Sequence, residues 1–277
     1  MTAMAALLPT LPDWTTWTMI APDRRQLVVR TIGSGPPLVM LHGGISSAGF
    51  YGSVAEDLAA SHEVHLLERR NCGVSTATPI PHDFDVEAAD ICALIRLLGP
   101  NCNVFGHSAG ALAALAAQRR DPLLVGRLAL YEPPLTVAGE PARAALARFR
   151  AERADDWREA LRKALLSLGG VSTADVEGGL MTLASLAEEA RAALLDAIER
   201  QLEGLAAFRF HAHSLATSLH PLLVIEGEDS PPPLKESNRL LLAAAPTARR
   251  VVLPGQAHAA NLSNPAMLAA ALAEFFH

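Results

Sequence analysis

The chain has 277 residues, of which 50% are hydrophobic and 19% are charged, so it can bury a core and lacks the composition of a disordered chain. Its formal net charge of −6 argues against partners such as nucleic acid or anionic membranes, which bind basic surfaces. The length suits one large α/β domain that carries an insertion.

The predicted elements alternate between short apolar runs and stretches whose apolar residues repeat at helical spacing. The predicted strands of the first half are residues 26–33, 37–43, 63–68, 102–106 and 126–132, and the predicted helices are 49–60, 85–99 and 108–120. Because the strands are continuous apolar runs separated by helices, we predict a mainly parallel sheet covered on both faces.

The alternation stops after residue 132, where residues 141–169 and 182–208 are predicted to be helical with no strand between them. It resumes with strands at 221–227 and 249–255, and with helices at 235–246 and from Asn264-Pro265 to Phe276. We therefore predict a core domain of residues 1–132 and 220–277, and a helical insertion of residues 133–219.

The cysteine content and the N-terminal residues indicate the cellular compartment of the protein. Cys72, Cys92 and Cys102 are too few and too irregularly spaced for a disulfide framework or a tetrahedral metal site, so we expect reduced, buried thiols and no metal. The apolar residues 4–8 lack a basic leader, and no apolar run is long enough to cross a bilayer. We expect a soluble, cytoplasmic protein.

Ser108 stands between two glycines in 103-NVFGHSAGALAALAAQ-118, after a predicted strand and at the start of a predicted helix. Gly-x-Ser-x-Gly alone is a weak signal, and a serine helix cap is the other interpretation. A strand-to-helix turn of this kind needs small residues at Gly106 and Gly110, because the serine adopts a strained backbone that lifts its hydroxyl out of the sheet. In this context we predict that Ser108 is a nucleophile.

A serine hydroxyl needs a base, and His258 in 253-LPGQAHAANLSNP-265 follows the last predicted strand. We expect the side chain of His107 to point away from Ser108. The base needs a carboxylate partner, and Asp229 lies just past another strand in 222-LLVIEGEDSPP-232, with Glu228 beside it. The chain order Ser108, Asp229, His258 is the order of one particular fold.

An oxyanion would need two backbone donors. The N–H of Ala109 at the helix start is one, and the glycine pair Gly43-Gly44 after an earlier strand supplies the other from Gly44 or from Ile45.

Together these segments resemble the α/β-hydrolase superfamily, from about residue 25 to the C-terminus except for the insertion. The matching segments are 41-LHGG-44, 104-VFGHSAG-110, 221-PLLVIEGEDSPP-232 and 254-PGQAHAAN-261. The resemblance implies an eight-stranded, mostly parallel sheet, with a helical cap formed by residues 133–219 between strands six and seven.

One segment departs from the family's usual pattern, and another offers an alternative position for the acid. In 68-ERRNCGVS-75, Glu68 and Asn71 replace the usual aspartate and first glycine of the family's Asp-x-Arg-Gly-x-Gly-x-Ser stretch. Some family members place the acid after strand six, where Glu132 stands in 129-ALYEPP-134, so Glu132 is the alternative to Asp229.

The predicted function is hydrolysis of a small, apolar carboxylic ester, lactone or thioester through an acyl-serine intermediate, with a small-molecule substrate and no cofactor. Hydrolysis of a carbon–carbon bond and a non-catalytic small-molecule receptor are the alternatives. A substrate pocket could use apolar cap residues, although ordinary cap packing explains them equally well. These residues are Phe149, Trp157, Leu180, Met181, Phe208 and Phe210.

Overall fold

The computed structural model describes residues 14–44, 46–73, 75, 82–216 and 220–277. Its centre is an eight-stranded sheet in the order β1-β2-β4-β3-β5-β6-β7-β8. The strands are β1 (Thr15–Ile20), β2 (Gln26–Gly33), β3 (Pro37–Leu41), β4 (Glu63–Leu67), β5 (Cys102–His107), β6 (Val125–Tyr131), β7 (Leu222–Gly227) and β8 (Arg249–Leu253). The β1–β2 and β2–β4 pairs are antiparallel, and the other pairs between the described strands are parallel. The predicted fold class is confirmed.

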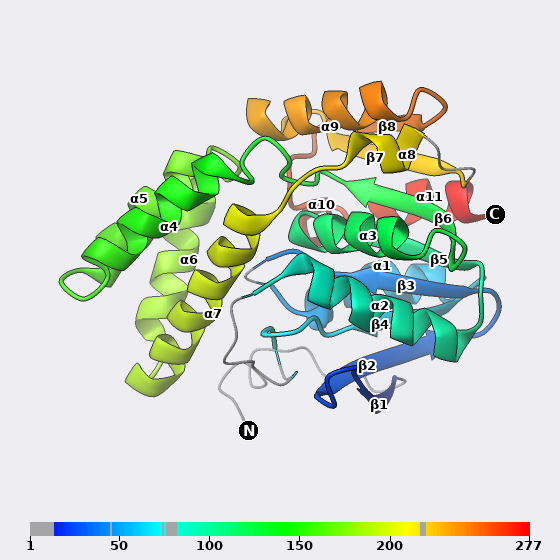
Figure 1. Ribbon diagram of the computed structural model, residues 1–277, viewed down its shortest axis with the longest axis horizontal. Helices are drawn as coiled ribbons and strands as arrows, with labels where there is room; N and C mark the ends of the chain where they lie inside the picture. Colours follow the sequence, from blue (N-terminus) through cyan, green and yellow to red (C-terminus); the bar gives the residue numbers. More distant parts are fainter. Residues whose placement is uncertain (1–13, 45, 74, 76–81, 217–219) are drawn as a thin grey trace.

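Helices cover both faces of this sheet, as continuous apolar strands require. The flanking helices are α1 (Gly52–Leu58), α2 (Phe84–Leu98), α3 (Ala109–Arg120), α9 (Pro232–Ala244), α10 (Ala260–Ser263) and α11 (Pro265–Phe276), with a 3₁₀ turn η2 at Ala48–Tyr51. Successive side chains of β3 divide between the two layers: Val39 and Leu41 pack with α2 and α3, while Leu38 and Met40 pack with α1 and α11. Figure 1 shows α2 and α3 on the near face and α1 and α11 on the far face.

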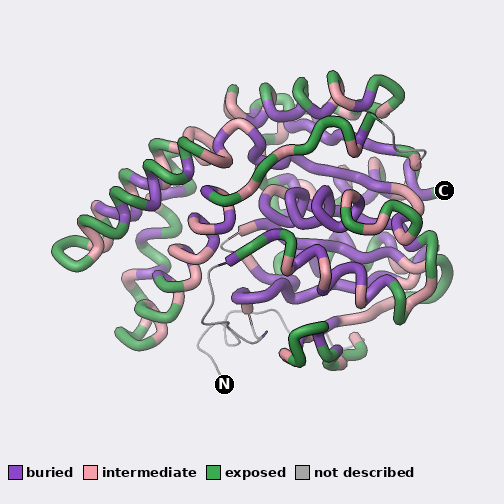
Figure 2. Tube along the Cα trace, in the orientation of Figure 1, coloured by how far each residue is buried: buried purple, intermediate pink, exposed green. Residues whose placement is uncertain are grey.

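Helix α3 is the most deeply packed of these helices. Every residue from Ala109 to Gln118 is buried, and Figure 2 shows the buried colour along most of the helix. Its alanine-rich sequence explains this position, because small side chains let the helix lie close to both the sheet and α2.

The regular elements described between β6 and β7 are all helices: α4 (Glu140–Glu152), α5 (Trp157–Leu168), α6 (Thr173–Ser185), α7 (Glu188–Ala207) and α8 (Ala212–Ala216). The predicted helix over 141–169 is divided in two, because Asp156 caps the start of α5 with its side chain. Helix α6 was not predicted from the sequence. Helices α4 to α7 share a hydrophobic core of their own and project from one end of the sheet (Figure 1), and we call the described segment 133–216 that contains them the cap.

Candidate active site

Ser108 occupies the tight turn between β5 and α3. Its backbone has φ 53° and ψ −122°, a left-handed conformation that is strained for a residue with a side chain. A Cβ on Gly106 would lie 2.6 Å from the Gly110 carbonyl oxygen, and a Cβ on Gly110 would lie 2.3 Å from the Leu41 carbonyl oxygen. The glycines are therefore required by close backbone approach, and the turn presents half-buried Ser108 directly after the carboxyl end of β5.

His258 lies in the loop after β8 and lines the same cavity as Ser108. Its Nδ1 is 2.7 Å from Oε2 of Glu132, and the other carboxylate oxygen of Glu132 accepts a hydrogen bond of 2.7 Å from the Gly227 N–H. Glu132 is fully buried and directly follows β6. Its carboxylate is thus fixed between the ends of two neighbouring strands and orients the imidazole.

The sequence prediction that Asp229 would orient His258 is wrong. Asp229 is exposed, in a turn closed by the hydrogen bond from Ser230 N–H to the Gly227 carbonyl, and its own N–H donates to the Gln256 carbonyl. This turn directs Asp229 outward, whereas Glu132, with φ 48°, turns inward. The alternative acid after strand six is the one that meets the histidine. Glu228 is also occupied elsewhere, because its carboxylate accepts from the Gly255 N–H at 2.8 Å.

Gly44 and Ala109, the predicted oxyanion donors, both line the cavity. They are neighbours, since a Cβ built on Gly44 would lie 3.5 Å from Cβ of Ala109. Ala109 begins α3, where backbone N–H groups have no partner within the helix. Ile45, the alternative donor, lies outside the described residues.

His107 does not point away from the site as expected. Its ring centroid is 4.5 Å from that of His258 and 4.7 Å from that of Tyr131, against which it stacks, and its Nδ1 contacts the Tyr51 hydroxyl. Burial, together with the neighbouring His258, holds the pKa of His107 well below its ordinary value. A neutral ring therefore supports one side of His258.

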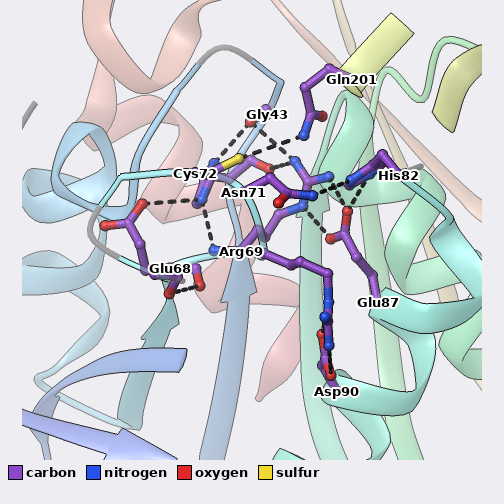
Figure 3. Close-up of polar contacts among 12 residues, drawn as sticks. Gly43, Glu68, Arg69, Asn71, Cys72, His82, Glu87, Asp90 and Gln201 are labelled. Atoms are coloured by element: carbon purple, nitrogen blue, oxygen red, sulfur yellow. Dashed lines mark hydrogen bonds and ion pairs between the residues drawn. The ribbon is translucent and has the colours of Figure 1, made fainter. Parts of the chain in front are cut away.

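A buried ion pair fixes the loop that carries Gly44. The guanidinium of Arg69 bonds both oxygens of Glu87 at 2.7 and 2.8 Å and donates to the carbonyls of His42 and Gly43 at 3.1 and 3.2 Å (Figure 3). Burial alone would raise the pKa of Glu87, but Arg69 and His82 lower it to about 2. The carboxylate is therefore charged at neutral pH. This role of Arg69 was not predicted from the sequence.

Glu68 and Asn71, the two departures from the family's pattern in the segment 68–75, are both accommodated by the local structure. Asn71 has φ 62°, a left-handed conformation that asparagine tolerates better than most residues, which explains how it replaces a glycine. Glu68 accepts a hydrogen bond of 3.1 Å from the Ala48 N–H, and its carboxyl group occupies the space next to Gly73.

The cavity has a volume of about 340 Å³ and lies between the cap and the carboxyl edge of the sheet. No aspartate, glutamate, lysine or arginine lines it among the residues that the structure describes. Its apolar lining is Phe50, Pro134, Val137, Leu165, Leu168, Val171, Ile198, Leu202, Leu205, Leu234 and Leu262. The six cap residues suggested from the sequence do not line it; Phe149 and Leu180 pack inside the cap, for example, and Met181 is 74% exposed.

The described residues contain no cluster of three or more histidine, cysteine, aspartate or glutamate side chains that could hold a metal ion. They also contain no helix with the length and apolar character needed to cross a membrane.

Comparisons with known proteins agree with this architecture. Residues 38–271 match the alpha/beta hydrolase family. A pimeloyl-[acyl-carrier protein] methyl ester esterase of Xanthomonas campestris is 28% identical over 260 residues, which span 89% of this chain and 97% of the esterase. The crystal structure of an alpha/beta hydrolase from Sphaerobacter thermophilus superposes with a TM-score of 0.76 at 28% identity, covering 94% of this chain and 100% of that chain. A thermophilic esterase from Thermogutta terrifontis shares the fold, with a TM-score of 0.77 at 17% identity over 95% of this chain and 98% of its own.

Proposed function

We propose, from the premise that this chain belongs to the alpha/beta hydrolase family, that it hydrolyses small, apolar carboxylic esters through an acyl-serine intermediate. The observation that carries the proposal is that Ser108 and His258 line one apolar cavity while buried Glu132 orients the histidine. The esterase named among its relatives gives further support.

In the proposed mechanism, Nε2 of His258 takes the proton of the Ser108 hydroxyl as its oxygen attacks the ester carbonyl carbon. Glu132 holds Nδ1–H of the imidazole, which fixes the tautomer with a free Nε2 and stabilises the imidazolium that forms. No hydrogen bond joins Ser108 to His258 in the structure, and such contacts often tighten only when substrate binds.

The oxygen of the tetrahedral intermediate receives hydrogen bonds from the N–H groups of Gly44 and Ala109. His258 then protonates the leaving alcohol, and the acyl group remains on Ser108. A water molecule, deprotonated by His258, attacks the acyl-serine and releases the carboxylic acid. The uncharged cavity suits an apolar acyl group, because burying an unpaired charge there would be costly.

The test is hydrolysis of p-nitrophenyl esters of increasing acyl length by the intact protein and by Ser108→Ala. We expect kcat/KM to rise with chain length until the cavity is filled, and to fall by about 10³-fold or more in the variant. A fluorophosphonate probe should label Ser108. Equal ester hydrolysis by Ser108→Ala would refute the mechanism, and absence of labelling together with tight ligand binding would favour a receptor.

A further inference from the structure

Gln201 differs from every other cap residue that lines the cavity. The lining residues from the described segment 133–216 are Pro134, Val137, Leu165, Leu168, Gly170, Val171, Ile198, Gln201, Leu202 and Leu205. Nine of these ten have no polar side-chain group. Gln201 is therefore the one polar side chain that the described part of this segment presents to the cavity.

The amide nitrogen of Gln201 has a hydrogen-bond partner in the described chain, whereas the amide oxygen has none. The side chain leaves α7 and reaches down to the core, where Nε2 lies 3.6 Å from Sγ of Cys72 (Figure 3). Burial raises the pKa of the Cys72 thiol to about 12, so the sulfur is a neutral, weak partner. Oε1 is buried and has no hydrogen-bond partner within the described chain, and the residue as a whole is only 4% exposed.

The unpartnered oxygen lies next to Gly44, one of the two proposed oxyanion donors. A Cβ built on Gly44 would come 3.6 Å from Oε1 of Gln201 and 3.5 Å from Cβ of Ala109, so the amide oxygen faces the backbone that supplies the proposed oxyanion donors. A buried carbonyl oxygen without a donor costs free energy, and an apolar residue at this position of α7 would avoid that cost. A hydrogen-bond donor on the substrate would remove it.

We propose that Gln201 is a specificity-determining residue whose Oε1 accepts a hydrogen bond from a hydroxyl or amide N–H on the acyl group, at the carbon next to the scissile carbonyl. The proposal rests on the esterase function proposed above. The donor belongs to the acyl part because the leaving oxygen must face His258, whereas Gln201 faces Gly44. The donor is uncharged, since an ammonium group would find no carboxylate in the described lining.

The preferred substrate is therefore an ester of a 2-hydroxy or 2-acylamino carboxylic acid whose remaining chain is apolar. An acid of this class with a second, ionised carboxylate is disfavoured by the uncharged lining.

The test compares methyl 2-hydroxyhexanoate with methyl 2-methylhexanoate, which have similar sizes and differ in the hydroxyl donor. The ratio of their kcat/KM values is measured for the intact protein, Gln201→Leu and Gln201→Met. We expect the ratio to fall about tenfold in both variants, the size of effect typical of one lost hydrogen bond. Two variants are used so that poor folding of one, detected by circular dichroism, does not prevent the comparison.

Ile198→Val is the matched control, because Ile198 lines the same cavity from the same helix. It should change the two rates by a common factor and leave the ratio intact. An unchanged ratio in the Gln201 variants, with hydrolysis that still depends on Ser108, overturns the role of Gln201 alone. Loss of Ser108 dependence overturns the esterase function and, with it, the proposal for Gln201.

Discussion

The Nδ1 atom of His258 lies 2.7 Å from Oε2 of Glu132, a residue 126 positions earlier in the chain. This contact joins the end of β6 to the loop after β8 and is reinforced by Tyr131, whose hydroxyl donates to the Ala257 carbonyl beside His258.

Glu132→Gln should lower kcat by about 10³ to 10⁴-fold, because an amide can hold the imidazole in the wrong tautomer and cannot stabilise the imidazolium. Steady-state kinetics on one p-nitrophenyl ester provide the measurement. Asp229→Asn is the matched control and should stay within about twofold of the intact protein, as expected for an exposed side chain. A larger loss in Asp229→Asn than in Glu132→Gln would reverse the assignment of the acid.

Arg69→Met should destabilise the protein by about 3 to 5 kcal/mol, because it leaves the buried carboxylate of Glu87 without its main partner. It should also lower kcat, since the Gly43 carbonyl loses the guanidinium that fixes the neighbouring Gly44. Urea unfolding measures the first effect. The double variant Arg69→Met/Glu87→Leu should recover much of the stability but not the rate; parallel recovery of both would show that the guanidinium does not position Gly44.

Two glycine-to-alanine variants should have opposite effects on stability. Gly110→Ala would place a methyl group 2.3 Å from the Leu41 carbonyl oxygen and should cost several kcal/mol, on the order of the largest single-site effects. Gly178→Ala in α6 meets no atom within 4 Å and should stabilise the protein by about 0.5 to 1 kcal/mol through helix propensity. Thermal unfolding of the two variants side by side measures this contrast. A small effect of Gly110→Ala would show that the turn between β5 and α3 can relax around the added methyl group.

The lowered pKa of His107 predicts that the free energy of unfolding decreases in acid. The unfolded chain binds this proton more readily than the folded one, so the contribution of His107 to the free energy of unfolding is complete above about pH 6.5 and is lost as the pH falls below it. The slope from one such group is at most about 1.4 kcal/mol per pH unit. Burial is the main cause that lowers the pKa values of His62 and His65 as well, and both residues add to this loss of stability in acid.

His107→Gln isolates the share of His107, because glutamine can still bond the Tyr51 hydroxyl but does not titrate. The charged and titratable groups around His107 are His258, His42, Tyr51 and Tyr131, and all stay in place in the variant. Unfolding free energies measured between pH 5 and pH 8 should show a shallower slope for His107→Gln, and an identical slope would contradict the burial of a neutral ring.

The sequence predicted the sheet and the placement of Ser108 and His258, because each lies at a sharp local signal next to an apolar strand. It favoured Asp229 over Glu132 as the acid, whereas Glu132 is the residue that contacts His258. Both follow adjacent parallel strands, and the choice depends on the turn that each chain makes after the strand ends. Strand β1 was missed because its threonine-rich sequence lies at the sheet edge, where little of it is buried.

The residues that line the cavity could not be predicted from the sequence either. Which cap side chains face Ser108 depends on how four helices pack against one another, and the amphipathic pattern of each helix does not specify that packing. The two donors of the oxyanion site, in contrast, follow from glycine and helix-start signals that are local, although their functional role stays a prediction.

Glu132 is followed directly by Pro133 and Pro134, and its carboxylate is bonded to the Gly227 N–H on the neighbouring strand. Proline rings restrict backbone rotation at this exit from the sheet. We therefore expect movements of the cap not to reach the carboxylate of Glu132. If α4 to α7 moved as a unit, the chain would bend beyond Pro134 and the Glu132–His258 pair would keep its geometry. Such an arrangement lets the cap be lengthened, replaced or opened for substrate entry without altering the proton-transfer geometry.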